Sequence, residues 1–251
     1  MKGKVLTLAV VMCLLVGFAG ISAADAPRIL LIAKPDQTMV LADYLRPEFD
    51  VEIANEADLL DPYSELFTLE SLAQFDGIIL GELVMGAGYN GSAVMEASIQ
   101  GAIKSAVAQG TGFVHIGGWC SYQGGNPDWA GLWHGTPIDE ILPVHVSNTW
   151  DTNDDGVDIP RLNDARHPIA AGLDWRALQR FGGYNRVTAA EGAHVVLSDP
   201  KSRLPLIVTG TYGEGKTVAF TGGLAGGWDA DMIKWKDFPQ LWRNIAAFIA
   251  N

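Results

Sequence analysis

The chain has 251 residues, 48% of them hydrophobic, and its 17 basic and 29 acidic side chains give a formal net charge of −12. This length and apolar content suit a folded domain with a sizeable core. An acidic surface repels nucleic acid and anionic membranes, and no basic run offsets it. We therefore expect a small-molecule ligand or substrate as partner, and neither nucleic acid nor a membrane surface. These features do not determine the oligomeric state.

The first 24 residues have the pattern of a secretory signal peptide. Two lysines precede the apolar run Val5–Phe18, and the small residues Ser22 and Ala24 follow it. The run is shorter than the roughly 20 residues that a membrane-spanning helix needs. We expect cleavage after Ala24 and export of residues 25–251, as one domain, to a periplasmic or extracellular location.

Removal of this segment would leave Cys120 as the single cysteine of the mature chain, because Cys13 lies within it. No disulfide framework is therefore predicted. A lone thiol in an oxidising compartment is a liability, which favours a thiol that is either buried or used.

Apolar runs typical of buried strands alternate with helical patterns through the first half of the chain. The predicted strands are residues 28–33, 49–54, 77–81 and 113–116, and the predicted helices are residues 37–45, 69–74 and 92–109. This alternation predicts parallel strands joined by right-handed crossovers. We expect an α/β fold, a three-layer αβα sandwich around a mostly parallel sheet.

The second half has a different composition. Residues 123–168 are rich in Gly, Pro, Asn and Asp, which indicates long loops. Strands are predicted again at 194–198, 204–209 and 216–221, and an amphipathic helix at 237–250. No repeat or linker divides the chain into two domains.

The segment Gly210–Thr217 matches the phosphate-loop pattern of nucleotide-binding proteins letter for letter. That chemistry needs a helix directly after the lysine, because the helix N-terminus completes the phosphate cradle. Here β-branched and aromatic residues follow, as in a strand. We therefore predict a hairpin turn and no nucleotide cofactor; no other cofactor is indicated.

The acidic segment Asp151–Asp158 resembles the start of a calcium loop, with oxygen-bearing side chains at its first, third and fifth positions. Its twelfth position is Leu162, where a calcium loop places a bidentate glutamate. A solvated acidic turn is favoured, and no metal site is predicted.

All eight tryptophans follow Gly118, most of them in glycine-rich, loop-like sequence. They have two interpretations. Long loops need aromatic side chains to hold them onto the core, while exposed indole faces bind sugar rings or other flat ligands. As candidate ligand-binding residues we name Gly118, Trp119, Ser121, Trp133 and Tyr184.

Cys120 follows a predicted buried strand that ends in two glycines. Several hydrolase folds expose a nucleophile on such a turn. Catalysis would need a histidine base, for which His134 and His167 are candidates, and the Ser121 backbone N–H could then face the oxyanion. Neither histidine spacing is diagnostic, and a buried structural thiol remains the alternative.

Six segments together resemble a known family: Phe75–Leu80, Gly112–Gly118, Gly135–Pro143, His167–Leu173, Gly182–Val187 and Tyr212–Phe220. The chain resembles the class I glutamine amidotransferase-like superfamily and, more closely, a glutamine amidotransferase-like family related to trehalose-utilisation proteins. The resemblance spans most of the mature chain. It implies a flavodoxin-like αβα sandwich and a Cys-dependent amidase or glutaminase-like hydrolase with Cys120 as nucleophile.

The sequence departs from the superfamily pattern in two places. Tyr122 stands where the Gly-x-Cys-x-Gly turn has its second glycine, and residues 222–228 lack the late His-x-Glu pair. Two hypotheses follow: a thiol-dependent amidase or hydrolase with a degenerate triad, or a non-catalytic domain. The latter would bind a carbohydrate or other small ligand through its tryptophan-rich loops, at the C-terminal ends of the strands.

Overall fold

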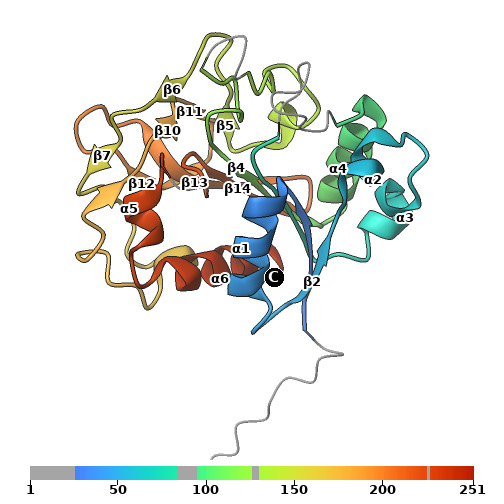
Figure 1. Ribbon diagram of the computed structural model, residues 1–251, viewed down its shortest axis with the longest axis horizontal. Helices are drawn as coiled ribbons and strands as arrows, with labels where there is room; N and C mark the ends of the chain where they lie inside the picture. The colour runs from blue at the N-terminus through green and yellow to red at the C-terminus, as the bar shows by residue number, and fades with distance from the viewer. Residues whose placement is uncertain (1–25, 84–94, 126–129, 225–226) are drawn as a thin grey trace, which may run out of the picture.

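The computed structural model describes residues 26–83, 95–125, 130–224 and 227–251 (Figure 1). The predicted signal peptide lies outside these residues. Within the described ranges, no helix combines the length and apolar character needed to cross a membrane.

One eight-stranded sheet forms the centre of the molecule, with the order β2-β1-β3-β4-β14-β13-β12-β8. Its first five strands are parallel neighbours, and the last three pairings are antiparallel. The strands are β1 (Arg28–Ile32), β2 (Asp50–Ile53), β3 (Gly77–Leu80), β4 (Gly112–Ile116), β8 (Arg161–Leu162), β12 (His194–Ser198), β13 (Pro205–Tyr212) and β14 (Gly215–Phe220). The predicted mostly parallel sheet is confirmed.

Helices cover both faces of this sheet, as the three-layer prediction required (Figure 1). α1 (Pro35–Leu45) and α6 (Phe238–Ile249) pack in one hydrophobic cluster, and α2 (Glu56–Leu60), α3 (Leu69–Leu72) and α4 (Ala97–Ala108) pack in the other. β3 and β4 are buried along their whole length, which explains their continuous apolar sequence.

The long-loop region contains more regular structure than its composition predicts. Three two-stranded ladders hold it: β5 (Val144–His145) with β11 (Thr188–Ala189), β6 (Thr152–Asn153) with β10 (Tyr184–Asn185), and β7 (Val157–Asp158) with β9 (Arg180–Phe181). The remaining elements are α5 (Ala230–Ile233) and the 3-10 helices at Glu65–Phe67, Asp139–Ile141 and Pro168–Ala170.

The phosphate-loop match is a hairpin, as predicted. β13 and β14 pair antiparallel from Ile207↔Phe220 to Tyr212↔Gly215, and Gly213 turns the chain with φ +57°. A strand therefore follows Lys216, where a nucleotide site would need a helix.

The strand register gathers four segments at one edge. β1, β3, β4 and β14 run parallel, with Ile32 beside Leu80, Leu80 beside His115, and Ile116 beside Phe220. The residues that follow each strand therefore lie close together. In open α/β sheets this C-terminal edge is where ligands bind.

Candidate functional site

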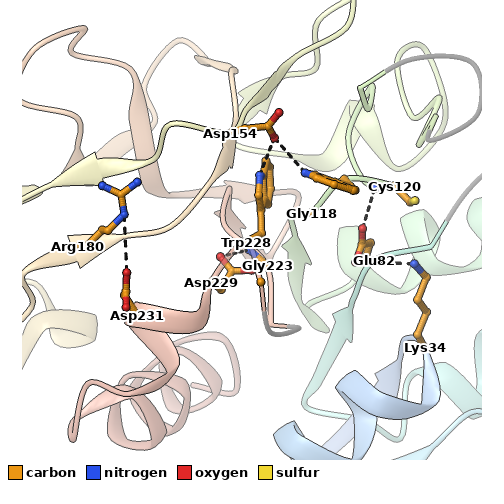
Figure 2. A pocket seen from close by; sticks show the side chains of 12 residues that line it. Lys34, Glu82, Gly118, Cys120, Asp154, Arg180, Gly223, Trp228, Asp229 and Asp231 are labelled. Atoms are coloured by element: carbon orange, nitrogen blue, oxygen red, sulfur yellow. Dashed lines mark hydrogen bonds and ion pairs between the residues drawn. The ribbon is translucent and has the colours of Figure 1, made fainter.

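A cavity of about 510 Å³ opens at this edge of the sheet (Figure 2). Its lining mixes aromatic, acidic and basic side chains with glycines: Lys34, Glu82, Gly118, Trp119, Cys120, Asp154, Arg180, Gly223, Gly227, Trp228, Asp229 and Asp231. Four of these residues follow the strands that meet at this edge: Lys34 after β1, Glu82 after β3, Gly118 after β4 and Gly223 after β14.

The turn after β4 closes tightly onto Glu82. Gly118 has φ +144°, and a Cβ at this position would lie 2.5 Å from Glu82 Cδ. The absence of a side chain lets the Cys120 backbone N–H approach and donate to Glu82 Oε1 at 2.7 Å. The glycine at position 118 therefore allows the turn to contact Glu82 in the cavity wall.

Glu82 itself is held from α1. Gln37 donates from Nε2 to Glu82 Oε2 at 3.0 Å and accepts the Glu82 backbone N–H at 3.0 Å. Lys34 Nζ lies 3.8 Å from Glu82 Oε2. The carboxylate thus has a fixed position beside the thiol-bearing turn.

Cys120 lies in the cavity wall but is only 2% exposed. Burial raises the pKa of its thiol to about 11, and the charge of Glu82 and a hydrogen bond to it act in the same direction, against a smaller opposite effect of Lys34. The thiol is therefore protonated at neutral pH. A nucleophilic cysteine has the reverse environment, electropositive and more accessible.

Neither candidate base is among the residues that line this cavity. His134 Nδ1 lies 2.9 Å from the Val146 carbonyl oxygen and 3.6 Å from Asp139 Oδ2. His134 is thus engaged with the loop around β5, away from the cavity lining.

His167 caps a 3-10 helix by accepting the Ile169 N–H on Nδ1, and its Nε2 lies 3.3 Å from Thr209 Oγ1. Its ring stacks on His194 at 5.3 Å, and burial and then the charge of His194 lower its pKa. The structure therefore brings His167 to the middle of β13 and not to Cys120.

Ser121 cannot supply the oxyanion donor that the amidase hypothesis gave it. Its backbone N–H already donates to the Gly118 carbonyl at 3.2 Å, and the residue is fully buried. Its hydroxyl donates to Ile116 O at 2.6 Å and lies 3.0 Å from His115 Nε2. Burial lowers the pKa of His115 to about 3, so this buried histidine stays neutral.

Three further aromatic residues belong to the core. Tyr122 takes φ +49° at the position of the missing glycine, and its ring stacks on His115 at 4.5 Å. Trp133 is fully buried and donates to the Leu83 carbonyl at 2.9 Å, and Tyr184 is 1% exposed with its hydroxyl on Asp199. Neither Trp133 nor Tyr184, both candidate ligand residues, lines the cavity.

Trp119 and Trp228 form an aromatic wall of the cavity. Both indole N–H groups donate to the same oxygen, Asp154 Oδ1, at 3.0 Å and 2.8 Å (Figure 2). Trp228 also packs on the backbone at Gly183, where a Cβ would lie 2.0 Å from its ring. Trp119 keeps 44% of its surface exposed. Two loops distant in sequence are thus joined at one carboxylate.

Three carboxylates of the acidic turn Asp151–Asp158 have partners within the protein. Asp154 accepts the two indoles, and Asp158 pairs with Arg180 at 2.5 Å. Asp151 is buried and accepts the backbone N–H groups of Gln123 and Gly124. Across the described ranges, no three His, Cys, Asp or Glu side chains are arranged to hold a metal ion.

Asp229 faces the cavity from the residue before α5 and is 1% exposed. Its Oδ1 accepts the Gly223 N–H at 3.0 Å. Burial raises the pKa of this carboxyl to about 8, with a further contribution from the charge of Glu82. The cavity thus contains a carboxylic acid that is largely protonated at neutral pH, able to donate a hydrogen bond.

Several residues that line the cavity are not predicted from the sequence as site residues. Lys34 and Glu82 could have been found as polar residues directly after buried strands, at the edge where ligands bind. Asp154, Arg180, Asp229 and Asp231 carry no such pattern, because they enter the cavity from the short ladders and from the segment before α5 and its first turn.

A family model described as "putative glutamine amidotransferase" matches residues 40–251. No match to a curated protein was found. Among solved structures, two proteins of Salmonella typhimurium, both described as cytoplasmic, are 21% and 22% identical. They align with TM-scores of 0.74 and 0.73 over 88% of this chain and 99% and 98% of theirs.

A ThuA-like protein from Parabacteroides merdae aligns over 90% of both chains, with 16% identity and a TM-score of 0.55. At these identities the three structures establish the fold alone. The full-length agreement supports the mostly parallel αβα sandwich found here.

Proposed function

This chain belongs to the family described as "putative glutamine amidotransferase". The described lining of its cavity contains two tryptophans and no histidine. We propose that this cavity binds a small polyhydroxylated ligand such as a hexose. The observation that carries the proposal is the shared Asp154 acceptor, which fixes Trp119 and Trp228 in one wall.

The chemistry of the cavity suits such a ligand. The C–H face of a sugar ring packs on an indole, while its hydroxyl groups need both acceptors and donors. Glu82 supplies acceptor oxygens, and Lys34 and Arg180 supply donors. Asp229, protonated at neutral pH, adds an acidic O–H. The pre-formed tryptophan wall reduces the ordering cost of binding.

Titration of the protein with glucose, galactose and mannose, followed by tryptophan fluorescence, tests this proposal. We expect at least one hexose to change the emission saturably. Trp119→Ala and Trp228→Ala should each weaken that binding about 10-fold or more, since each removes half of the aromatic wall. Trp150→Ala is the matched control, because Trp150 is 43% exposed and does not line the cavity.

A flat response to every hexose would contradict the proposal. So would an affinity that the Trp119 and Trp228 variants leave as unchanged as the Trp150 control. Thermal denaturation of the three variants checks that each is folded.

A thiol-dependent amidase is the second candidate, because Cys120 stands in the wall of the same cavity. In that case Glu82, whose Oε1 accepts the Cys120 N–H and whose carboxylate also hydrogen-bonds the thiol, would receive the thiol proton. The raised thiol pKa and the engaged Ser121 amide weigh toward the binding function.

Alkylation by iodoacetamide at pH 8 separates the two candidates. We expect Cys120 in the folded protein to react on the order of 100-fold more slowly than an unperturbed thiol, because a pKa of about 11 leaves little thiolate. The same protein unfolded in urea should react at the ordinary rate. Glu82→Gln should accelerate the reaction by removing a neighbouring negative charge. Rapid alkylation of the folded wild type would favour the amidase instead.

We further propose export, supported by the signal-peptide pattern alone. The first strand begins at Arg28, so cleavage after Ala24 leaves the sheet complete. The intact mass of the protein recovered from a cell with a secretory pathway should correspond to a chain that starts at Asp25. A mass that includes residues 1–24 would contradict export by this route.

A further inference from the structure

A second cavity of about 460 Å³ adjoins the first. It lies beside α5 and β9, and its lining again combines carboxylates, cations and a tryptophan: Asp158, Ala177, Leu178, Gln179, Arg180, Asp231, Lys234 and Trp235. Arg180 and Asp231 line both cavities. These two side chains therefore form the partition between them.

The partition is a weak ion pair. Arg180 Nε lies 3.8 Å from Asp231 Oδ2, and the two side chains are 35% and 59% exposed (Figure 2). An exposed pair at this separation contributes little to stability. The Arg180 guanidinium is anchored separately, on Asp158 Oδ1 and on the Asp155 carbonyl. Hydroxyl groups of a ligand could thus replace the contact with Asp231 while the arginine stays in place.

The second cavity has polar and charged groups like those of the first, but its tryptophan is buried. Trp235 is 5% exposed and packs against Trp175 with ring centroids 5.3 Å apart. Among the described residues its indole Nε1 has no hydrogen-bond partner, an uncommon state for a buried donor. Asp158 and the exposed Gln179 add acceptors to the lining of this cavity.

We propose that the two cavities are neighbouring subsites of one elongated site, which takes a ligand of at least two polyhydroxylated rings, such as a disaccharide, across the Arg180–Asp231 pair. This inference rests on the proposed function, because the first ring would occupy the cavity walled by Trp119 and Trp228. It adds the size of the ligand and the residues that recognise its second ring.

Calorimetric titration of the full chain with glucose, galactose and mannose, and with the β-1,4-linked disaccharide and trisaccharide of each, tests the inference. For one sugar series we expect the disaccharide to bind about 10-fold or more tightly than the hexose. Trp235→Phe and Gln179→Ala should each reduce that advantage while leaving the hexose affinity unchanged, since both residues line the second cavity alone.

Gln179 is exposed, so its variant keeps the test decisive if Trp235→Phe fails to fold. If at least one hexose binds, a disaccharide of another series that binds where its own hexose does not also supports the inference. Equal affinity for hexose and disaccharide overturns the inference and leaves the proposed function standing. The same conclusion follows if both folded variants still bind the disaccharide more tightly than the hexose by the wild-type factor. No binding of any sugar contradicts the proposed function itself.

Discussion

Replacing Asn185 by alanine is expected to lower the free energy of unfolding by about 3–5 kcal/mol. Asn185 is fully buried and braces the turn that carries Cys120. Its Oδ1 accepts the Gly118 N–H at 2.9 Å, and its Nδ2 donates to Gly118 O, Ser121 O and Asp151 Oδ1 at 3.1, 3.3 and 2.9 Å. Alanine would leave a buried N–H and a buried carboxyl without these partners.

Urea denaturation at pH 7, followed by circular dichroism, measures this loss. Asn163→Ala is the control, because Asn163 is exposed and, among the side chains of the described residues, its amide exchanges hydrogen bonds with the Ser198 hydroxyl. We expect the control to lose about 1 kcal/mol. Equal losses for the two variants would show that Asn185 does not brace the turn.

The second large effect is a change in the pH dependence of stability on replacing Asp229 by asparagine. The folded-state pKa of Asp229 is about 8, against 3.8 for an unperturbed aspartate, because the carboxyl is buried and lies near Glu82. A group with a raised folded pKa contributes stability that is present below its unfolded pKa and is lost as the pH rises through the folded value. Wild-type stability should therefore fall between about pH 4 and pH 8 on account of this group.

Asparagine keeps the acceptor for the Gly223 N–H and has no proton to lose. Each pKa unit corresponds to about 1.4 kcal/mol, so we expect Asp229→Asn to gain about 2–6 kcal/mol relative to wild type between pH 4 and pH 9. Thermal unfolding across this range measures the difference. Asp151, whose pKa burial raises to about 6, also makes the free energy of unfolding depend on pH, and it does so equally in variant and wild type. Parallel curves for variant and wild type would contradict the raised pKa of Asp229.

The sequence predicted the parts of the fold that have a strong periodic pattern. Buried strands such as β3 and β4 are continuous apolar runs, and α6 has one apolar face, so their positions agree within a few residues. The sequence does not predict the three two-stranded ladders (β5 with β11, β6 with β10, β7 with β9), because a two-residue strand has no period to detect. Their pairing depends on tertiary contacts between segments distant in the chain.

The site was predicted only in part for a similar reason. The glycine turn after β4 marked Gly118, Trp119 and Cys120, all of which line the cavity. The partners of Cys120 could not be found in the same way. Glu82 reaches it from the segment after β3, 38 residues earlier, whereas the candidate bases His134 and His167 lie elsewhere. Asp154 gains its role from two indoles that the fold, and not the local sequence, brings together.

A crystal structure of the protein soaked with the hexose that binds most tightly in solution tests the central claim most directly. We expect a sugar ring in the cavity, in contact with Trp119 or Trp228 and within hydrogen-bond distance of Glu82 or Asp229. A ring bound elsewhere on the molecule, with this cavity holding only water, would contradict it.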